Sequence, residues 1–271
     1  MLRHFPAVLI ACAAVSFGQI ADAHEFWIEP VTTRVAVGEP LEARTYIGNA
    51  FEGEELANYP SMQVMFDITL GDQTRALGGA AEQIPAVSTP ALGEGLHILR
   101  YQSRDFQLTY ETYADFLAFL KEADRMDLAE AQGPGSAPQD SIREVYFRYA
   151  KSLIAVGDGA GSDRWMGMPW ELVALTNPYT AARRAAMEFE LRFNAELQAD
   201  AAVHVFVRAG DGRVSQLRLR SDSRGLVTVP SDIDGTYMVN AIKVMPASKR
   251  MEYLLGATWQ SLWASATYVI E

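Results

Sequence analysis

The sequence predicts a mainly β protein with two β-sandwich-like domains and a helical insert between them. Three observations support this prediction. Short runs rich in Val, Ile, Tyr and Phe are separated by Gly, Pro and Asn in both halves of the 271-residue chain. A segment with helical spacing interrupts these runs near the middle, and the strand-like pattern returns from Trp170. Many short strands at close spacing are typical of β-sandwiches.

The chain begins with the pattern of a secretory signal peptide, over residues 1–23. A charged start is followed by an apolar run over residues 6–17, which is too short for the roughly 20 residues that span a bilayer. Ala21-Asp22-Ala23 then supplies small residues at the positions that define a cleavage site. We therefore expect the mature chain to begin at His24.

Cys12 is the only cysteine, and it lies inside the expected signal peptide. It ends a lipobox-like stretch, Leu9-Ile10-Ala11-Cys12, so lipid attachment at Cys12 is the alternative to cleavage after Ala23. After cleavage the chain has no cysteine, which excludes disulfides, thiolate metal sites and a cysteine nucleophile.

The composition indicates an acidic protein outside the cytoplasm. Lys and Arg number 23 against 34 Asp and Glu, for a net charge of −11. This charge argues against nucleic acid and anionic lipid as partners. Beyond the signal no stretch approaches 18 apolar residues, so we expect no direct membrane insertion after cleavage. The predicted location is periplasmic or secreted.

The first predicted domain covers residues 24–160 and combines strands with a helical segment. Tyr113–Ala131 has helical spacing and ends at a Gly/Pro-rich stretch. Ile142–Val156 is compatible either with a helix or with a helical turn that leads into a strand. The strands predicted in this domain are Thr33–Gly38, Leu41–Ile47, Met62–Leu70 and Leu96–Tyr101.

The second predicted domain covers residues 161–271 and is a small antiparallel sandwich. Its last strand, Leu262–Ile270, alternates between a wholly apolar face and a mixed face. Four tryptophans could line a ligand groove, but core packing is the better explanation for them. They are Trp165, Trp170, Trp259 and Trp263. The other predicted strands are Met187–Asn194, Ala202–Arg208, Gln216–Arg220, Leu226–Val229 and Thr236–Val244.

The histidines are the residues most able to carry chemistry. Once freed by cleavage, His24 offers its α-amine and its ring Nδ1, which together can chelate one metal ion. A second histidine facing this pair would complete a T-shaped site of three nitrogens, suited to Cu(II) or Ni(II). Glu25 and the acidic stretch Glu52-Gly53-Glu54-Glu55 could add oxygen ligands.

Two histidines compete for the third nitrogen position. His97 shares its strand face with Leu99 and Tyr101, a setting in which a histidine needs a hydrogen bond or a metal, although a satisfied core histidine explains it as well. His204 alternates onto the same face as Arg208 and is better explained as a surface histidine. His97 is therefore the preferred partner of His24, with His204 as the second choice.

Five stretches resemble one family of secreted bacterial proteins of undefined function, often labelled periplasmic components of nickel or cobalt uptake systems. They are AHEFWIEP, REVYFRYAKSLIAVG, MPWELVALTNPY, SDSRGLVTVPSDIDGTYMVNAIKV and WQSLWASATYVI. The resemblance implies an immunoglobulin-like N-terminal domain and a transthyretin- or carboxypeptidase-regulatory-like C-terminal domain. It also implies a role connected with divalent transition metals, with His24 in a histidine-containing start that the family shares.

These observations favour a periplasmic accessory protein that binds Ni, Co or Cu and assists nickel or cobalt uptake. Its partner would be a membrane metal transporter component. No Gly-x-Ser-x-Gly, His-Glu-x-x-His or P-loop motif is present, and we expect no enzymatic activity. Two alternatives stay open: a copper-dependent oxidative enzyme with an N-terminal histidine brace, and a metal-free module that binds protein or glycan.

Overall fold

The computed structural model describes residues 25–132 and 140–271. Strands make up 54% of it and helices 11%, which confirms the mainly β class with several sheets and a small helical insert. The expected signal peptide and His24 lie outside the described residues. Within the described ranges, no helix combines the length and the apolar character needed to cross a bilayer.

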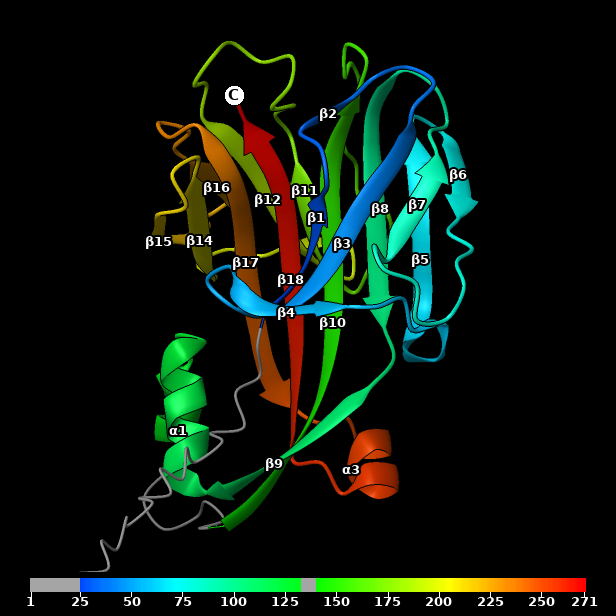
Figure 1. The fold of residues 1–271 in the computed structure, drawn as a ribbon. Coiled ribbons are helices and arrows are strands. Elements are labelled where there is room, and N and C mark those ends of the chain that lie inside the picture. The colour runs from blue at the N-terminus through cyan, green and yellow to red at the C-terminus, as the bar shows by residue number, and fades with distance from the viewer. Residues whose placement is uncertain (1–24, 133–139) are drawn as a thin grey trace, which may run out of the picture.

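A ten-stranded central sheet runs through the whole molecule (Figure 1). Its path joins β15, β14, β17, β18, β10, β8, β5 and β6, while β2 and β9 also pair with β10. The bounds are β15 Val214–Arg220, β14 Ala202–Ala209, β17 Gly235–Pro246, β18 Trp259–Ile270, β10 Asp140–Val156, β8 Gly95–Ser103, β5 Gln63–Leu70, β6 Gln73–Ala76, β2 Arg34–Val35 and β9 Phe106–Thr112.

Two four-stranded sheets cover the two faces of the central sheet. Figure 1 shows β1 and β3 in front of it and β11 and β12 behind it. The front sheet consists of β1 Glu25–Pro30, β3 Pro40–Asn49, β4 Glu52–Leu56 and β7 Val87–Pro90. The back sheet consists of β11 Trp170–Ala174, β12 Met187–Phe193, β13 Glu196–Leu197 and β16 Leu226–Val229. The protein is therefore a stack of three β layers.

The helical segment is two helices rather than the single helix predicted over Tyr113–Ala131. The helices of the structure are α1 Tyr113–Glu122, α2 Met126–Gln132 and α3 Lys249–Leu255, with a 3-10 turn at Pro60–Met62. Thr112 and Asp115 form a capping box that begins α1. Phe116, Phe119 and Leu120 of α1 pack in a cluster with Trp263 of β18. The helix thus covers the end of the central sheet that β1 leaves open.

The segment 142–156, for which the sequence left a helix and a strand open, is a strand over its whole length and forms most of β10. Its residues alternate between the two cores: Tyr149 and Leu153 belong to the cluster on the back side, and Ala150 and Ile154 to the cluster on the front side. Because residues 148–156 are buried on both faces, the strand lacks the apolar–polar alternation that identifies a half-buried strand. This is why its sequence is also compatible with a helix.

The central sheet contains strands from both predicted domains. β10, from the predicted 24–160 range, pairs in parallel with β18, from the predicted 161–271 range. The apolar face predicted for Leu262–Ile270 is confirmed, since its five alternating residues all belong to the back cluster. Three of the four tryptophans are buried, while Trp165 is 43% exposed. The boundary after residue 160 stays a prediction.

A buried ion network ties β10 to the segment that follows it. Lys151 Nζ lies 2.9 Å from Asp163 Oδ1 and 2.6 Å from Glu171 Oε1, and it also donates to the Arg164 carbonyl at 3.0 Å. The three ionised side chains are at most 1% exposed. Four backbone N–H groups, among them those of Met166 and Ala174, donate hydrogen bonds to the two carboxylates. Every proton of the ammonium group therefore has an acceptor.

We expect Lys151→Met to lower the free energy of unfolding by about 3–5 kcal/mol, because it leaves two buried carboxylates without a cation. Urea unfolding followed by circular dichroism measures this loss. The matched control is Lys249→Met, which removes an exposed ion pair with Glu252 and should change stability by less than about 0.5 kcal/mol. Similar losses in the two variants would contradict a structural role for the network.

A second buried carboxyl lies where β10 meets β9 and β18. Glu144 is 1% exposed, accepts a hydrogen bond from the Tyr110 hydroxyl at 2.5 Å, and accepts another from Ser261. Burial raises the pKa of Glu144 to about 7, although both hydrogen bonds oppose this rise. The folded state therefore favours the neutral carboxyl more than the unfolded chain does.

This raised pKa predicts a loss of stability with rising pH. The neutral Glu144 carboxyl makes its full contribution to the free energy of unfolding below pH 4.5, its ordinary pKa. This contribution is lost as the pH rises to about 7, the pKa of Glu144 in the folded state. Glu144→Gln removes this dependence, so it should gain stability relative to the wild type between pH 4.5 and 8, by on the order of 3 kcal/mol. Urea titrations at several pH values test this. The exposed Glu196→Gln should keep the wild-type slope, and an equal slope in Glu144→Gln would contradict the raised pKa.

Candidate functional site

Strand β1, which begins one residue after His24, is held over the centre of the molecule. Ser265 of β18 donates a hydrogen bond to the Phe26 carbonyl at 2.6 Å, and Thr267 donates one to the Ile28 carbonyl. Phe26 and Ile28 belong to the front apolar cluster. These contacts fix the position of β1 and therefore the place where the chain enters the front sheet.

The other side of β1 faces strand β14 through two successive contacts. Glu29 forms an ion pair with Arg208 at 2.5 Å. Two residues earlier on each strand, Trp27 and Phe206 lie in one buried cluster with Met238. Both strands advance by two residues from one contact to the other, as side chains on the same face of a strand do.

The same two-residue spacing along β1 and β14, taken one step further toward the start of both strands, reaches Glu25 and His204. Continuing two residues back along both strands puts Glu25, which is 3% exposed, level with His204. His204 pairs across the central sheet with Asn240, and Asn240 pairs with Ser265, the residue that holds Phe26. The start of β1 therefore lies over a polar row of the central sheet.

His204 is buried, at 7% exposure, and is not the surface histidine that the sequence indicated. His204 shares a strand face with Arg208 as predicted, but β1 and Phe51 cover that face of the central sheet. Burial is the main cause that lowers the pKa of His204, and nearby Arg218 lowers it further. The imidazole is thus neutral at pH 7, which is the form that binds metal ions. No residue that the structure describes forms a hydrogen bond to its ring.

Asn240, next to His204 in the row, was not singled out from the sequence. It is 2% exposed, and its Nδ2 is buried without a hydrogen-bond partner among the described residues. A buried amide normally has one. One feature of the sequence could have pointed to it: Asn240 is the single uncharged polar residue in the otherwise apolar stretch Tyr237–Ile242. A neutral imidazole, a carboxylate and an amide are nitrogen and oxygen donors that fit a transition-metal ion.

His97 lies in a different environment. It is 0% exposed, its Nε2 accepts a hydrogen bond from the Leu92 N–H at 3.0 Å, and its Nδ1 lies 3.2 Å from the Gly95 carbonyl. This pattern assigns the proton to Nδ1. Burial lowers the pKa of His97, so the ring is neutral. Both ring nitrogens are already engaged, and binding an ion through either would break a hydrogen bond.

The structure keeps His97 and His204 apart. Their strands, β8 and β14, are separated by β10, β18 and β17, so four steps of about 4.8 Å put them roughly 19 Å apart across the sheet. One ion cannot bind both, because metal–nitrogen distances are about 2 Å. Among the described residues, no group of three or more His, Cys, Asp and Glu could hold a metal ion. His24 lies outside these residues.

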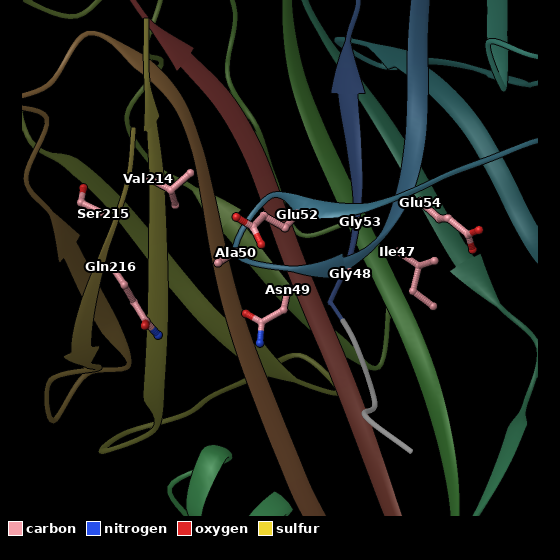
Figure 2. Close-up of a pocket in the computed structure, with 10 residues that line it drawn as sticks. All are labelled: Ile47, Gly48, Asn49, Ala50, Glu52, Gly53, Glu54, Val214, Ser215 and Gln216. Carbon is pink, nitrogen blue, oxygen red and sulfur yellow. The ribbon is translucent and has the colours of Figure 1, made fainter. Parts of the chain in front are cut away.

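The predicted acidic ligands are divided between an ion pair and an open groove. Glu55 pairs with Arg44 at 2.8 Å. Glu52 and Glu54 line a groove of about 780 Å³ between the β3–β4 hairpin and β15 (Figure 2). Figure 2 shows Glu54 pointing away from the β15 side of this groove. The groove includes Gly48, the register partner of Glu25, so it lies beside the start of β1.

Comparisons with known proteins give a family but no characterised relative. A family model described as a domain of unknown function (DUF4198) matches residues 21–244. None of the curated proteins matches the chain. The solved tetra-tandem repeat in the extending region of a large adhesion protein is 11% identical, with a TM-score of 0.23, over 92% of this chain and 50% of that chain.

A second solved structure, the Escherichia coli alpha-2-macroglobulin activated by porcine elastase, is 10% identical with a TM-score of 0.22. It is matched over 92% of this chain and 20% of its own. The chain thus spans half or less of the length of either structure. Likenesses at these TM-scores carry no argument about fold or function.

The hydrogen bonds of His97 predict an inert ring. Nitrogen NMR should show a neutral imidazole with the proton on Nδ1 down to pH 6.5, because burial lowers the pKa below that ordinary value. Addition of Ni(II) should leave the His97 ring signals unchanged while those of His204 broaden. Broadening of both rings to a similar extent would show that His97 is also a ligand.

Proposed function

We propose that this chain, which belongs to the DUF4198 family, is an exported accessory protein that binds a transition-metal ion through its processed N-terminal histidine. One observation supports this most strongly. The strand spacing set by Glu29–Arg208 and Ser265–Phe26 puts Glu25, which directly follows His24 in the sequence, level with the buried, neutral His204. After cleavage, His24 would supply its α-amine and ring Nδ1 as a chelating pair.

The described residues suggest the rest of the ligand set. His204 is preferred over His97 as the third nitrogen, since no described residue forms a hydrogen bond to its ring, whereas both nitrogens of His97 are engaged. Glu25 is the nearest candidate for an oxygen ligand. Three nitrogens suit Cu(II) and Ni(II), and Co(II) accepts the same donors.

The proposed role is to receive the ion outside the cytoplasm and pass it to a membrane metal transporter component of a nickel or cobalt uptake system. The family resemblance suggests this role. The net charge of −11 agrees with it, because an acidic protein attracts cations. The ion is cargo here, so no enzymatic step is required of the protein.

Isothermal titration of the mature protein beginning at His24 tests the proposal with Ni(II), Co(II) and Cu(II). We expect one site, and a loss of affinity on the order of a hundredfold in a variant with one alanine before His24, since the α-amine then becomes an amide. His204→Asn should weaken binding on the order of tenfold or more. The matched control Glu196→Gln removes an exposed carboxylate of the back sheet and should change affinity little.

Equal affinity of the mature and alanine-extended proteins would contradict the N-terminal site. Reductant-dependent oxygen consumption by the copper-loaded protein would favour the histidine-brace enzyme instead. If none of the three ions binds, the metal-free module that binds protein or glycan is the better explanation.

A further inference from the structure

A cavity of about 290 Å³ lies between the front sheet and the central sheet, next to Phe106 at the start of β9. Six of its fifteen lining residues are aromatic, among them Phe26, Phe66, Tyr101 and Tyr146. The volume is at the lower end for small-molecule sites. The cavity therefore has room for a small and largely apolar molecule.

Arg148 of β10 is the only charged residue among those that line this cavity. It is 6% exposed, and its Nε is buried with no hydrogen-bond partner in residues 25–132 and 140–271. The guanidinium carbon lies 5.0 Å from the ring centre of Phe106 and 5.1 Å from that of Tyr146. Within the described part of the chain, no carboxylate or carbonyl pairs with this side chain. Aromatic faces attract a cation but do not neutralise it.

Tyr101 adds a hydroxyl to the same cavity. Its ring is fixed by Phe26, with centroids 4.4 Å apart, and by Phe66, at 5.4 Å. Burial raises the pKa of Tyr101 to about 12, although the charge of Arg148 opposes the rise, so the hydroxyl keeps its proton at neutral pH. Of the described residues, none forms a hydrogen bond to it. Tyr101 and Arg148 thus both offer donors to a molecule in the cavity.

We propose that this cavity binds a small organic monocarboxylate with a flat apolar body, whose carboxylate pairs with Arg148. A carboxylate matches the planar fork of a guanidinium and can accept two hydrogen bonds from it. One positive charge and no negative charge among the lining residues suit a monoanion. A phosphate dianion would keep one charge without a partner. The aromatic lining suits the apolar body of the ligand.

This site is separate from the proposed metal site. Phe26 lines the cavity, whereas Trp27 packs on the opposite side of β1 with Phe206. The carboxylate site requires neither the processed terminus nor a metal ion, so its test is independent of the metal-binding proposal.

Benzoate is the probe, and calorimetric titration together with its effect on Tm is the measurement. We expect benzoate to bind and to raise Tm, and uncharged benzamide, which has the same ring, to do neither. Arg148→Met should weaken benzoate binding on the order of ten- to a hundredfold, the value of a charge-assisted hydrogen-bonded pair. The matched control Arg213→Met removes a surface arginine with an 85% exposed side chain and should leave affinity unchanged.

Folding of the Arg148→Met protein is a second readout. Because Arg148 has no acidic partner in the part of the chain that the structure describes, this variant should keep or exceed the Tm of the ligand-free wild type, whereas a purely structural arginine would lower it. Equal binding of benzoate and benzamide, of phosphate and benzoate, or of benzoate by wild type and Arg148→Met would overturn the proposal. If Arg148→Met does not fold, Tyr101→Phe decides, since it keeps the ring packing: unchanged benzoate affinity would overturn the proposal.

Discussion

Residues 148–156 of strand β10 are covered by other sheets on both faces, so the two charged side chains there, Arg148 and Lys151, have to find their partners inside the protein. Lys151 does so on the back side, where two carboxylates and a carbonyl accept its three protons. Arg148, three residues earlier and on the front side, lies against the aromatic faces of Phe106 and Tyr146, and no carboxylate of the described residues pairs with it. The same strand thus carries a lysine whose charge is fully paired and an arginine that no described carboxylate neutralises. The Lys151 network stabilises the layers, and Arg148 is the residue proposed to bind a ligand.

Strand β1 separates the two candidate sites. Hydrogen bonds from Ser265 and Thr267 of β18 fix its height above the central sheet. The alternation of a strand then sends Phe26 to the carboxylate cavity and Trp27 to the side of His204 and Phe206. Since both sites depend on the position of the same six-residue strand, a change in its packing would affect them together.

The sequence predicted the strands that have one apolar face, such as Leu262–Ile270, because alternation is a local signal. It did not resolve β10, whose two faces are both buried. It placed His204 and Arg208 on the same strand face but did not show that β1 covers this face. The residues of β1 are far away in the chain: Glu29 and its partner Arg208 are 179 positions apart. Arg148 was missed for the same reason. A local pattern does not show whether a distant carboxylate will neutralise an arginine.

The net charge sets opposite conditions for the two proposed ligands. At −11, the field of the whole protein favours the approach of a metal cation and opposes that of a carboxylate. Salt screens this field beyond about 8 Å at physiological ionic strength, whereas a buried pair is screened much less. Affinity for an anion must therefore come from the immediate surroundings of Arg148, where no lining residue is acidic. Binding of a cation at the start of β1 should weaken with added salt, and binding of a carboxylate at Arg148 should be much less sensitive to it.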